Sequence, residues 1–277
     1  MDAPAALADK PANAAAKPAA LPISCYIRTL NEARMVGRVI EGALLICSEV
    51  IVVDSGSTDD TVGIAERAGA RVVKQPWLGL GKQKRVGEEL CANDWLLDLD
   101  ADEIVTPEFA AEVRAIFAKG EPLCAAYETM LVTVPPVGKP WWGFAVTDRR
   151  KLYDKRKLRQ PDHVAWDQFT IPSDMKVGRI RAPLMHYSFP DLQHLAAKLN
   201  GYSGVGARES KPKAFWIVAL RVMFAEPFYF LKFLIGRGLW RAGLYGWAVS
   251  GVVAHGRWLR DAKMLELQLK QREAARK

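Results

Sequence analysis

The stretch Trp95-Leu96-Leu97-Asp98-Leu99-Asp100-Ala101-Asp102-Glu103 decides the fold class of this chain. It is an apolar strand pattern that runs directly into a group of acidic residues. Side chains repeat every two residues along a strand, so Asp100 and Asp102 are predicted to point along one face. Two carboxylates held that close repel each other unless a cation lies between them. Oxygen ligands at this spacing suit Mg²⁺ or Mn²⁺ holding a diphosphate, although the pattern alone is also typical of a solvated acidic turn.

The residues upstream alternate between strand and helix patterns. The segments 23–32 and 49–61 each begin as an apolar strand, and the second strand ends in Asp54 and a Ser/Gly turn. Between them, apolar residues recur at the spacing of a helix that is buried on one face: Val36, Val39, Ile40, Ala43, Leu44 and Cys47. The chain is therefore predicted to run strand, helix, strand.

The same alternation continues as far as the acidic stretch. Ser57 or Thr58 is expected to cap a helix that runs through Ala68. A third strand is predicted at residues 71–74, and a helix around residues 82–90 leads into the acidic strand. Strands that alternate with helices of this length predict βαβ units and a mostly parallel sheet, which is an α/β fold.

Polar residues gather where the predicted strands end. In parallel sheets, ligands bind beyond the carboxyl ends of the strands. The polar residues at these ends are Thr29, Asn31, Glu32, Asp54, Ser55, Asp100 and Asp102. Their convergence predicts a ligand site at this edge of the sheet.

Several segments resemble family 2 glycosyltransferases with the GT-A nucleotide-sugar-binding fold. The N-terminal ones are Thr29-Leu30-Asn31-Glu32 and residues 53–61, 75–84 and 99–103. Residues 184–192, with Met185-His186-Tyr187-Ser188, and residues 198–203 resemble the bacterial lipopolysaccharide core β-glucosyltransferase branch. The resemblance covers roughly residues 22–205 and weakens towards residue 260. It implies an inverting, metal-dependent enzyme that moves a hexose, with glucose favoured, from a UDP-sugar to a lipopolysaccharide core acceptor.

The donor side of such a site can be assigned to residues of this chain. Asp54 is expected to accept a hydrogen bond from uracil or ribose, with a helix cap as its alternative role. Thr29, Asn31 and Glu32 are expected on the other side of the nucleoside, although Glu32 would equally suit the first turn of a helix. Ser55 belongs to the same pocket.

The diphosphate side depends more on the resemblance. Lys84 is the lysine that its family position favours for the diphosphate. Asp102 is the preferred metal ligand, and Asp100 would reach the ribose, or the metal through water. The resemblance implies that His186 completes the metal shell, with Mg²⁺ or Mn²⁺ as the ion. A lone histidine is also often a purely structural residue.

The catalytic base is predicted in the segment Gln160–Phe169. Relatives usually carry a His-Glu pair before the His-Tyr-Ser motif, and this segment has none. Asp167 falls closest to the expected position, and Asp162 is the second choice. Trp141 and Trp142, earlier in the chain, suit either a platform for the acceptor sugar or the core.

Three regions are predicted along the 277 residues. Residues 1–21 are rich in Ala and Pro and are expected to be a disordered leader rather than a signal peptide. Residues 22–205 form the catalytic domain, and residues 206–277 form a helical extension. The four cysteines lack any C-x-x-C pair, which favours buried free thiols in a reducing cytoplasm over disulfides or zinc.

The C-terminal extension is both basic and apolar. From Val205 onward there are 14 lysines and arginines against 5 acidic residues. Arg221, Glu226 and Lys232 interrupt the apolar windows, which disfavours a transmembrane span. Amphipathic basic and aromatic helices predict a peripheral protein on an anionic membrane surface. The resemblance implies that this surface is the inner face of the bacterial inner membrane. The alternative is a helical subdomain packed on the core or on a second subunit; no nucleic-acid signature is present.

Two rival functions stay open at this point. One is a family 2 transferase that acts on another lipid-linked or capsular acceptor. The other is a catalytically inactive homologue that serves as a binding or scaffold subunit, which the altered base segment keeps possible. A sugar-nucleotide pyrophosphorylase is disfavoured because no N-terminal Gly-rich loop with a basic cluster is present.

Overall fold

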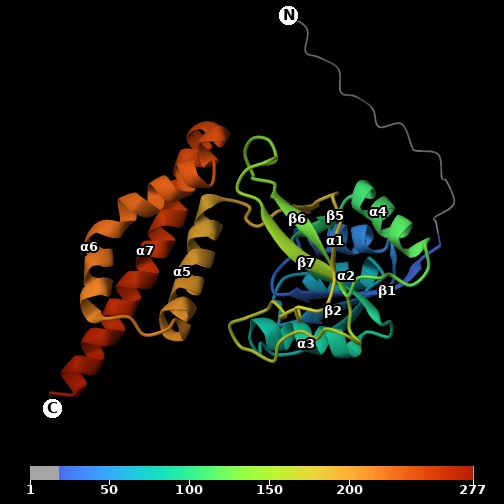
Figure 1. The fold of residues 1–277 in the computed structure, drawn as a ribbon, viewed down its shortest axis with the longest axis horizontal. Coiled ribbons are helices and arrows are strands. Elements are labelled where there is room, and N and C mark those ends of the chain that lie inside the picture. Colours follow the sequence, from blue (N-terminus) through green and yellow to red (C-terminus); the bar gives the residue numbers. More distant parts are fainter. Residues whose placement is uncertain (1–18, 277) are drawn as a thin grey trace, which may run out of the picture.

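The computed structural model describes residues 19–276. It contains an α/β unit built on one mixed sheet, and a helical unit made of the last three long helices (Figure 1). Most of the predicted leader, residues 1–18, lies outside the described residues. The first strand begins at Leu21, the last residue of that predicted leader.

One half of the sheet is parallel. Its strands, in spatial order, are β3 (Arg71–Lys74), β2 (Cys47–Asp54), β1 (Leu21–Thr29) and β4 (Trp95–Asp100). The connecting helices are α1 (Val36–Ala43), α2 (Thr61–Arg67) and α3 (Leu80–Leu90). Parallel strands require such crossover helices, so the βαβ pattern predicted from the sequence is confirmed.

The other half of the sheet is mixed. It continues through β7 (Thr147–Asp154), β6 (Ala126–Thr133), β9 (Leu184–His186) and β5 (Glu103–Val105), with β8 (Val177–Arg179) paired to β6. Helix α4 (Pro107–Phe117) follows β5, and its first turn is capped by the Thr106 side chain, which accepts from the Phe109 N–H. The antiparallel pairing of β5 with β9 places Glu103 opposite His186, so it brings a distant histidine beside the acidic stretch.

The sheet separates two apolar clusters. Alternate residues of β1 divide between them: Ile23, Cys25 and Ile27 pack with α1 and α4 on one face, while Tyr26 packs with α3 on the other. This alternation follows from the two-residue repeat of a strand. Both faces are covered, as is usual for parallel strands.

Two local predictions are wrong. Cys47 does not belong to the first helix: α1 ends at Ala43 and Cys47 opens β2, because it pairs with Leu21 of β1. Neither Ser57 nor Thr58 caps the second helix, which starts at Thr61. Their side chains are used within the preceding loops, as described below.

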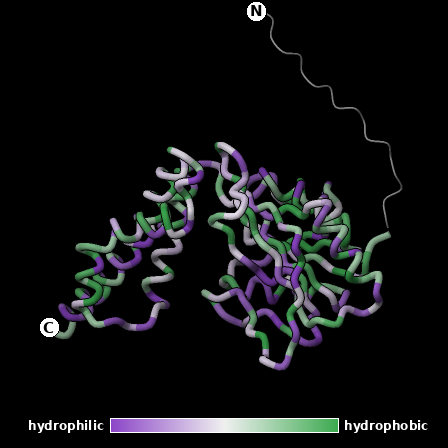
Figure 2. The backbone as a smooth tube through the Cα atoms, turned by 45° about the horizontal axis from the view of Figure 1, so that its top comes forward, coloured by the Kyte–Doolittle hydropathy of each residue, from purple (hydrophilic) through white to green (hydrophobic). Residues whose placement is uncertain are grey.

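The helical unit contains α5 (Leu192–Glu209), α6 (Phe215–Leu231) and α7 (Gly243–Ala274), with a π-helical turn (Lys232–Gly236) and a 3₁₀ turn (Leu239–Ala242) between the last two. Figure 2 shows hydrophobic residues, in green, along this unit as well as along the α/β unit. None of the described helices is both long and apolar enough to cross a membrane.

The predicted boundary after residue 205 falls inside α5. Leu195 and Leu199 of this helix pack in one cluster with Val249 of α7, so the whole of α5 goes with the helical unit. We therefore place the division near residue 190, between β9 and α5.

The loop between β6 and β7 joins the two units. Trp141 is buried in the cluster that contains Leu239 and Val249, whereas Trp142 is exposed. The Ala145 N–H donates to the Arg237 carbonyl at 2.9 Å. The structure therefore gives Trp141 a core position rather than a place on an open platform.

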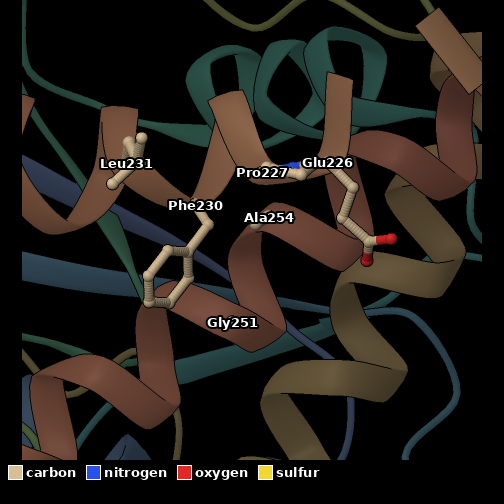
Figure 3. Close-up of a pocket in the computed structure, with 6 residues that line it drawn as sticks. All are labelled: Glu226, Pro227, Phe230, Leu231, Gly251 and Ala254. Atoms are coloured by element: carbon tan, nitrogen blue, oxygen red, sulfur yellow. The ribbon is translucent and has the colours of Figure 1, made fainter. Parts of the chain in front are cut away.

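A cavity of about 460 Å³ lies between α6 and α7, remote in sequence from the acidic stretch. It is lined by Glu226, Pro227, Phe230, Leu231, Gly251 and Ala254 (Figure 3). The predicted ligand residues are not part of its lining.

Candidate active site

The predicted ligand residues come together at the carboxyl edge of the parallel strands. Register pairs Thr29 of β1 with Asp54 of β2, and Arg28 of β1 with Asp100 of β4. The loops after these strands, and β9 beyond β5, complete the site. Topology alone accounts for this convergence, because parallel strands end at one edge.

Asp54 organises the loop that follows β2. Its buried carboxylate accepts from the N–H groups of Gly56 and Ser57, both at 3.0 Å, and from the hydroxyls of Ser57 and Thr29. Burial alone would raise the pKa of Asp54, but these hydrogen bonds outweigh it and lower the pKa. Asp54 therefore holds this loop as a charged acceptor, and it does not cap α2.

Two loops are tied to each other beside Asp54. The Asn31 side-chain oxygen accepts from the Thr58 N–H at 2.8 Å, and the Asn31 N–H donates to the Ser57 hydroxyl at 2.9 Å. Asn31 has a φ of 56°, a left-handed conformation that asparagine tolerates better than most residues. The Ser55 hydroxyl accepts from the Gln83 side chain at 3.1 Å. The site is thus prearranged by its own hydrogen bonds.

Lys84 lies beneath the site. Its ammonium and the carboxylate of Asp98 are 2.8 Å apart, and each side chain is only 1% exposed. The same ammonium is 3.5 Å from Asp167 and 3.8 Å from Asp100. Lys84 was predicted to contact the diphosphate. In the structure its ammonium is buried and pairs with acidic residues of the site.

Asp100 is held by cations on several sides. Its Oδ1 receives the Arg28 Nε–H at 2.9 Å, and its Oδ2 is 3.9 Å from Nζ of Lys151. Lys151 in turn pairs with Glu103 at 2.6 Å. Burial alone would raise the pKa of Asp100, but the charges of Arg28, Lys84 and Lys151 keep it well below its ordinary value.

Asp102 and His186 form a separate pair. Asp102 Oδ2 and His186 Nε2 are 3.4 Å apart. Burial alone would raise the pKa of Asp102 and lower that of His186; their mutual contact reverses both shifts. Burial and the charge of Asp102 raise the pKa of the neighbouring Glu32 to about 7.

Asp102 and His186 could supply two of the ligands of a divalent metal ion. Among residues 19–276, no group of three or more His, Cys, Asp or Glu side chains is arranged to hold an ion. One carboxylate and one imidazole suit a divalent ion that takes its remaining ligands from water and substrate phosphates. Asp102 and His186 are therefore brought together as predicted, whereas the Asp100 carboxylate turns to Arg28.

The two candidate bases lie in different environments. Asp167 is 25% exposed and lies 3.1 Å from the Arg28 guanidinium, inside the charged cluster. Asp162 is 76% exposed and has only a 3.7 Å contact with Lys82. The structure therefore brings Asp167 to the predicted site and leaves Asp162 on the surface.

Three site residues were missed in the sequence: Arg28, Lys151 and Lys198. Arg28 had a readable signal, because it is a lone charge near the end of a buried strand. Lys198 lies in a segment that resembles relatives, and its ammonium is 3.7 Å from Asp102 Oδ2. Lys151 had no local signal, since its partners Glu103 and Asp100 lie some fifty residues away.

With this geometry established, comparisons with known proteins define the class. The family model for glycosyl transferase family 2 matches residues 24–175. A protein of Rickettsia felis described as an uncharacterized glycosyltransferase is 34% identical, over 90% of this chain and 91% of its own length. The chain belongs to glycosyl transferase family 2 and is a glycosyltransferase.

Two further similarities are more specific. The lipopolysaccharide core biosynthesis glycosyltransferase LpsC of Rhizobium meliloti is 30% identical, over 84% of this chain and 88% of its own. Glucosyl-3-phosphoglycerate synthase of Mycobacterium tuberculosis, solved with Mn²⁺, UDP and glucosyl-3-phosphoglycerate, aligns with 41% of this chain and 43% of its own at 28% identity and a TM-score of 0.32. The family predicted from the sequence is confirmed by the family model, and the predicted α/β class by the sheet and its crossover helices.

Proposed function

We propose that this glycosyltransferase moves a hexose, with glucose as the first candidate, from a UDP-sugar to a lipopolysaccharide core acceptor. The observation that carries the proposal is the Asp102–His186 pair beside the prearranged Asp54 loop, at the carboxyl edge of the parallel strands. The similarity to LpsC supports the acceptor class.

Each residue set would then have a defined part. Asp54, with Thr29, Asn31 and Ser55 around it, would receive the nucleoside, and Glu32 lies beside the Asp102 side of the pocket. Asp102 and His186 would hold Mg²⁺ or Mn²⁺, which neutralises charge on the leaving diphosphate. The ion pairs of Asp100 with the surrounding cations would hold the end of β4 in place.

The transfer itself would be a single displacement. The acceptor hydroxyl attacks the anomeric carbon on the face opposite UDP, the bond from that carbon to the diphosphate oxygen breaks, and Asp167 takes the hydroxyl proton. One displacement inverts the configuration, so an α-linked donor gives a β-linked product. Asp167 is preferred to Asp162 because it lies within the charged cluster.

The helical unit would place the enzyme on its lipid substrate. Seven apolar side chains share one exposed face of α6 and the following turn, which we call the apolar stripe: Trp216, Leu220, Met223, Phe224, Phe228, Leu231 and Ile235. Arg221, Lys232 and Arg237 lie along the same segment. Exposed apolar surface next to basic residues fits the headgroup region of an anionic membrane. We therefore propose a peripheral position on the inner face of the bacterial inner membrane.

The decisive experiment is a transfer assay with the full-length protein, Mn²⁺, a panel of UDP- and ADP-sugars, and truncated lipopolysaccharide core acceptors. A β-linked hexose transferred from UDP-glucose to the core acceptor is the expected result. Transfer only to another lipid-linked or capsular acceptor would favour that alternative. Binding of the donor without turnover on any acceptor would favour an inactive scaffold, and absence of UDP-sugar binding would contradict the donor assignment.

A further inference from the structure

Lys198 connects the helical unit to the acidic site. It lies on α5, seven residues after Asp191, whose side chain caps the helix by accepting from the His194 N–H at 2.6 Å. Its ammonium is 3.7 Å from Asp102 Oδ2 and donates to the Ser188 carbonyl at 3.2 Å. Leu195 and Leu199, on the same helix, pack against α7 and the loop of Trp141. Packing of α5 therefore fixes the position of the Lys198 backbone relative to Asp102.

Lys198 differs from the other cations of the site in its pairing and in its exposure to solvent. Its ammonium faces Asp102, while Arg28, Lys84 and Lys151 are engaged with Asp98, Asp100, Glu103 and Asp167. The Lys198 side chain is 31% exposed, so its ammonium is partly open to solvent, unlike that of Lys84. A lysine has a flexible stem and three donors, which suit it to phosphate binding.

We propose that Lys198 is a diphosphate-binding residue, a step that rests on the proposed UDP-sugar function. Without donor, its ammonium neutralises Asp102. When a metal and the donor bind, the ammonium would turn from Asp102 to phosphate oxygens of the donor, while Asp102 and His186 would hold the metal. The diphosphate of the leaving UDP would then be contacted by the ammonium of a lysine on the helical unit.

This proposal predicts opposite effects on two ligands. Lys198 competes with a metal ion for Asp102 when no nucleotide is present, because both are cations on one carboxylate. Removal of its charge should therefore tighten Mn²⁺ binding to the nucleotide-free protein. The same change should weaken UDP binding in saturating Mn²⁺, because a phosphate contact is lost.

A structural role would behave differently. If Lys198 only pins α5 through Ser188 and Asp102, its loss should lower thermal stability and should not move the two affinities in opposite directions. Lys263 of α7 is a matched control, because it also pins α5. Its ammonium donates to the Asn200 carbonyl and to the Ser203 hydroxyl at 2.9 and 2.8 Å, with no contact to Asp102 among the described ion pairs.

The experiment compares Lys198→Met, Lys198→Gln and Lys263→Met in the full-length protein. Mn²⁺ binding to metal-free protein is followed by electron paramagnetic resonance, UDP binding in saturating Mn²⁺ by calorimetry, and melting temperature in parallel. We expect both Lys198 variants to bind Mn²⁺ more tightly and UDP about tenfold more weakly, which corresponds to about 1.4 kcal/mol. Lys263→Met should change only the melting temperature.

Lys198→Gln keeps a donor for the Ser188 carbonyl without the charge, so it decides the question even if Lys198→Met does not fold. Wild-type UDP affinity in Lys198→Gln, or two affinities that fall together as stability falls, would overturn the proposal. Failure of the wild-type protein to bind UDP would instead overturn the donor assignment, and this inference with it.

Discussion

At the scale of single residues, the acids of one short stretch have different partners. Asp98 pairs with Lys84, Asp100 with Arg28, and Asp102 with His186. Lys84 and Arg28 neutralise the first two, whereas Asp102 faces His186 and the partly exposed ammonium of Lys198. Asp102 is therefore the acid best placed for an external cation. Spacing in the sequence shows the acids but not these separate partners.

The metal assignment predicts the behaviour of Asp102→Asn. This change keeps the size of the side chain and removes its charge, so we expect kcat/KM to fall more than tenfold while the protein stays folded. EDTA should stop the wild-type reaction, and Mg²⁺ or Mn²⁺ should restore it. A variant that kept more than about a tenth of wild-type kcat/KM, a loss under about 1.4 kcal/mol, would show that Asp102 is not the metal ligand.

The base assignment predicts a difference between Asp167→Asn and Asp162→Asn. Loss of the base should lower kcat by about 10²–10⁴-fold in the Asp167 variant, with UDP affinity near normal. Asp162→Asn, on the exposed side of the same segment, is the control and should transfer at close to the wild-type rate. If only the Asp162 variant were slow, the base would be Asp162; if neither were slow, the base would lie outside this segment.

At the scale of elements, the start of α3 positions the base segment. The N–H groups of Leu80 and Gly81 donate to the carbonyls of Val164 and His163 at 2.6 and 3.0 Å. A Cβ on Gly81 would lie 2.3 Å from the Trp166 carbonyl and 2.4 Å from that of Pro161. The glycine at position 81 is therefore explained by close backbone approach.

Gly81→Ala should consequently displace the segment that carries Asp167. We expect a loss of about 1–3 kcal/mol in unfolding free energy and a reduced kcat, measured by denaturant titration and by transfer assay. Gly201→Ala is the control, because no neighbouring atom lies within 4 Å of its added Cβ on α5. The control should be neutral or more stable by about 0.5–1 kcal/mol. Equal effects of the two changes would contradict the close-approach explanation.

At the scale of the whole molecule, the helical unit exposes the apolar stripe, while Val218 and Tyr229 of α6 are buried in contact with α7. Helix α7 contacts both α5 and α6, and the loop of Trp141 joins this unit to the sheet. Phe224 and Phe228 of the stripe are 68% and 65% exposed. Large aromatic side chains left open in this way indicate a surface that meets another phase or partner.

The membrane proposal predicts that Phe224→Ser with Phe228→Ser weakens flotation with anionic vesicles at least tenfold. Salt should weaken the binding of the wild-type protein, because basic residues contribute to it. Leu123→Ser is the control, since Leu123 is 92% exposed on the α/β unit and should not contact lipid. Unchanged flotation of the double variant, or binding that ignores lipid charge, would contradict the proposal and favour a protein partner for the stripe.

The sequence by itself determined the α/β class, the order of the first four strands along the chain, the family and the edge at which the site lies. These follow from local periodicity and from motifs whose residues are close in the chain, such as Asp54 with its Ser/Gly turn. Helix α4 was predicted for the same reason, because Thr106 and Pro107 are adjacent signals.

Only the tertiary structure decided which acid meets which cation. Lys151 reaches Glu103, Arg28 reaches Asp100 and Asp167, and Lys198 reaches Asp102, across separations of 48 to 139 residues. No periodic pattern encodes such pairs, because they depend on how strands register and where helices dock. For the same reason, only packing against α7 assigned α5 to the helical unit, and only the tertiary structure shows that the Lys84 ammonium is buried against Asp98.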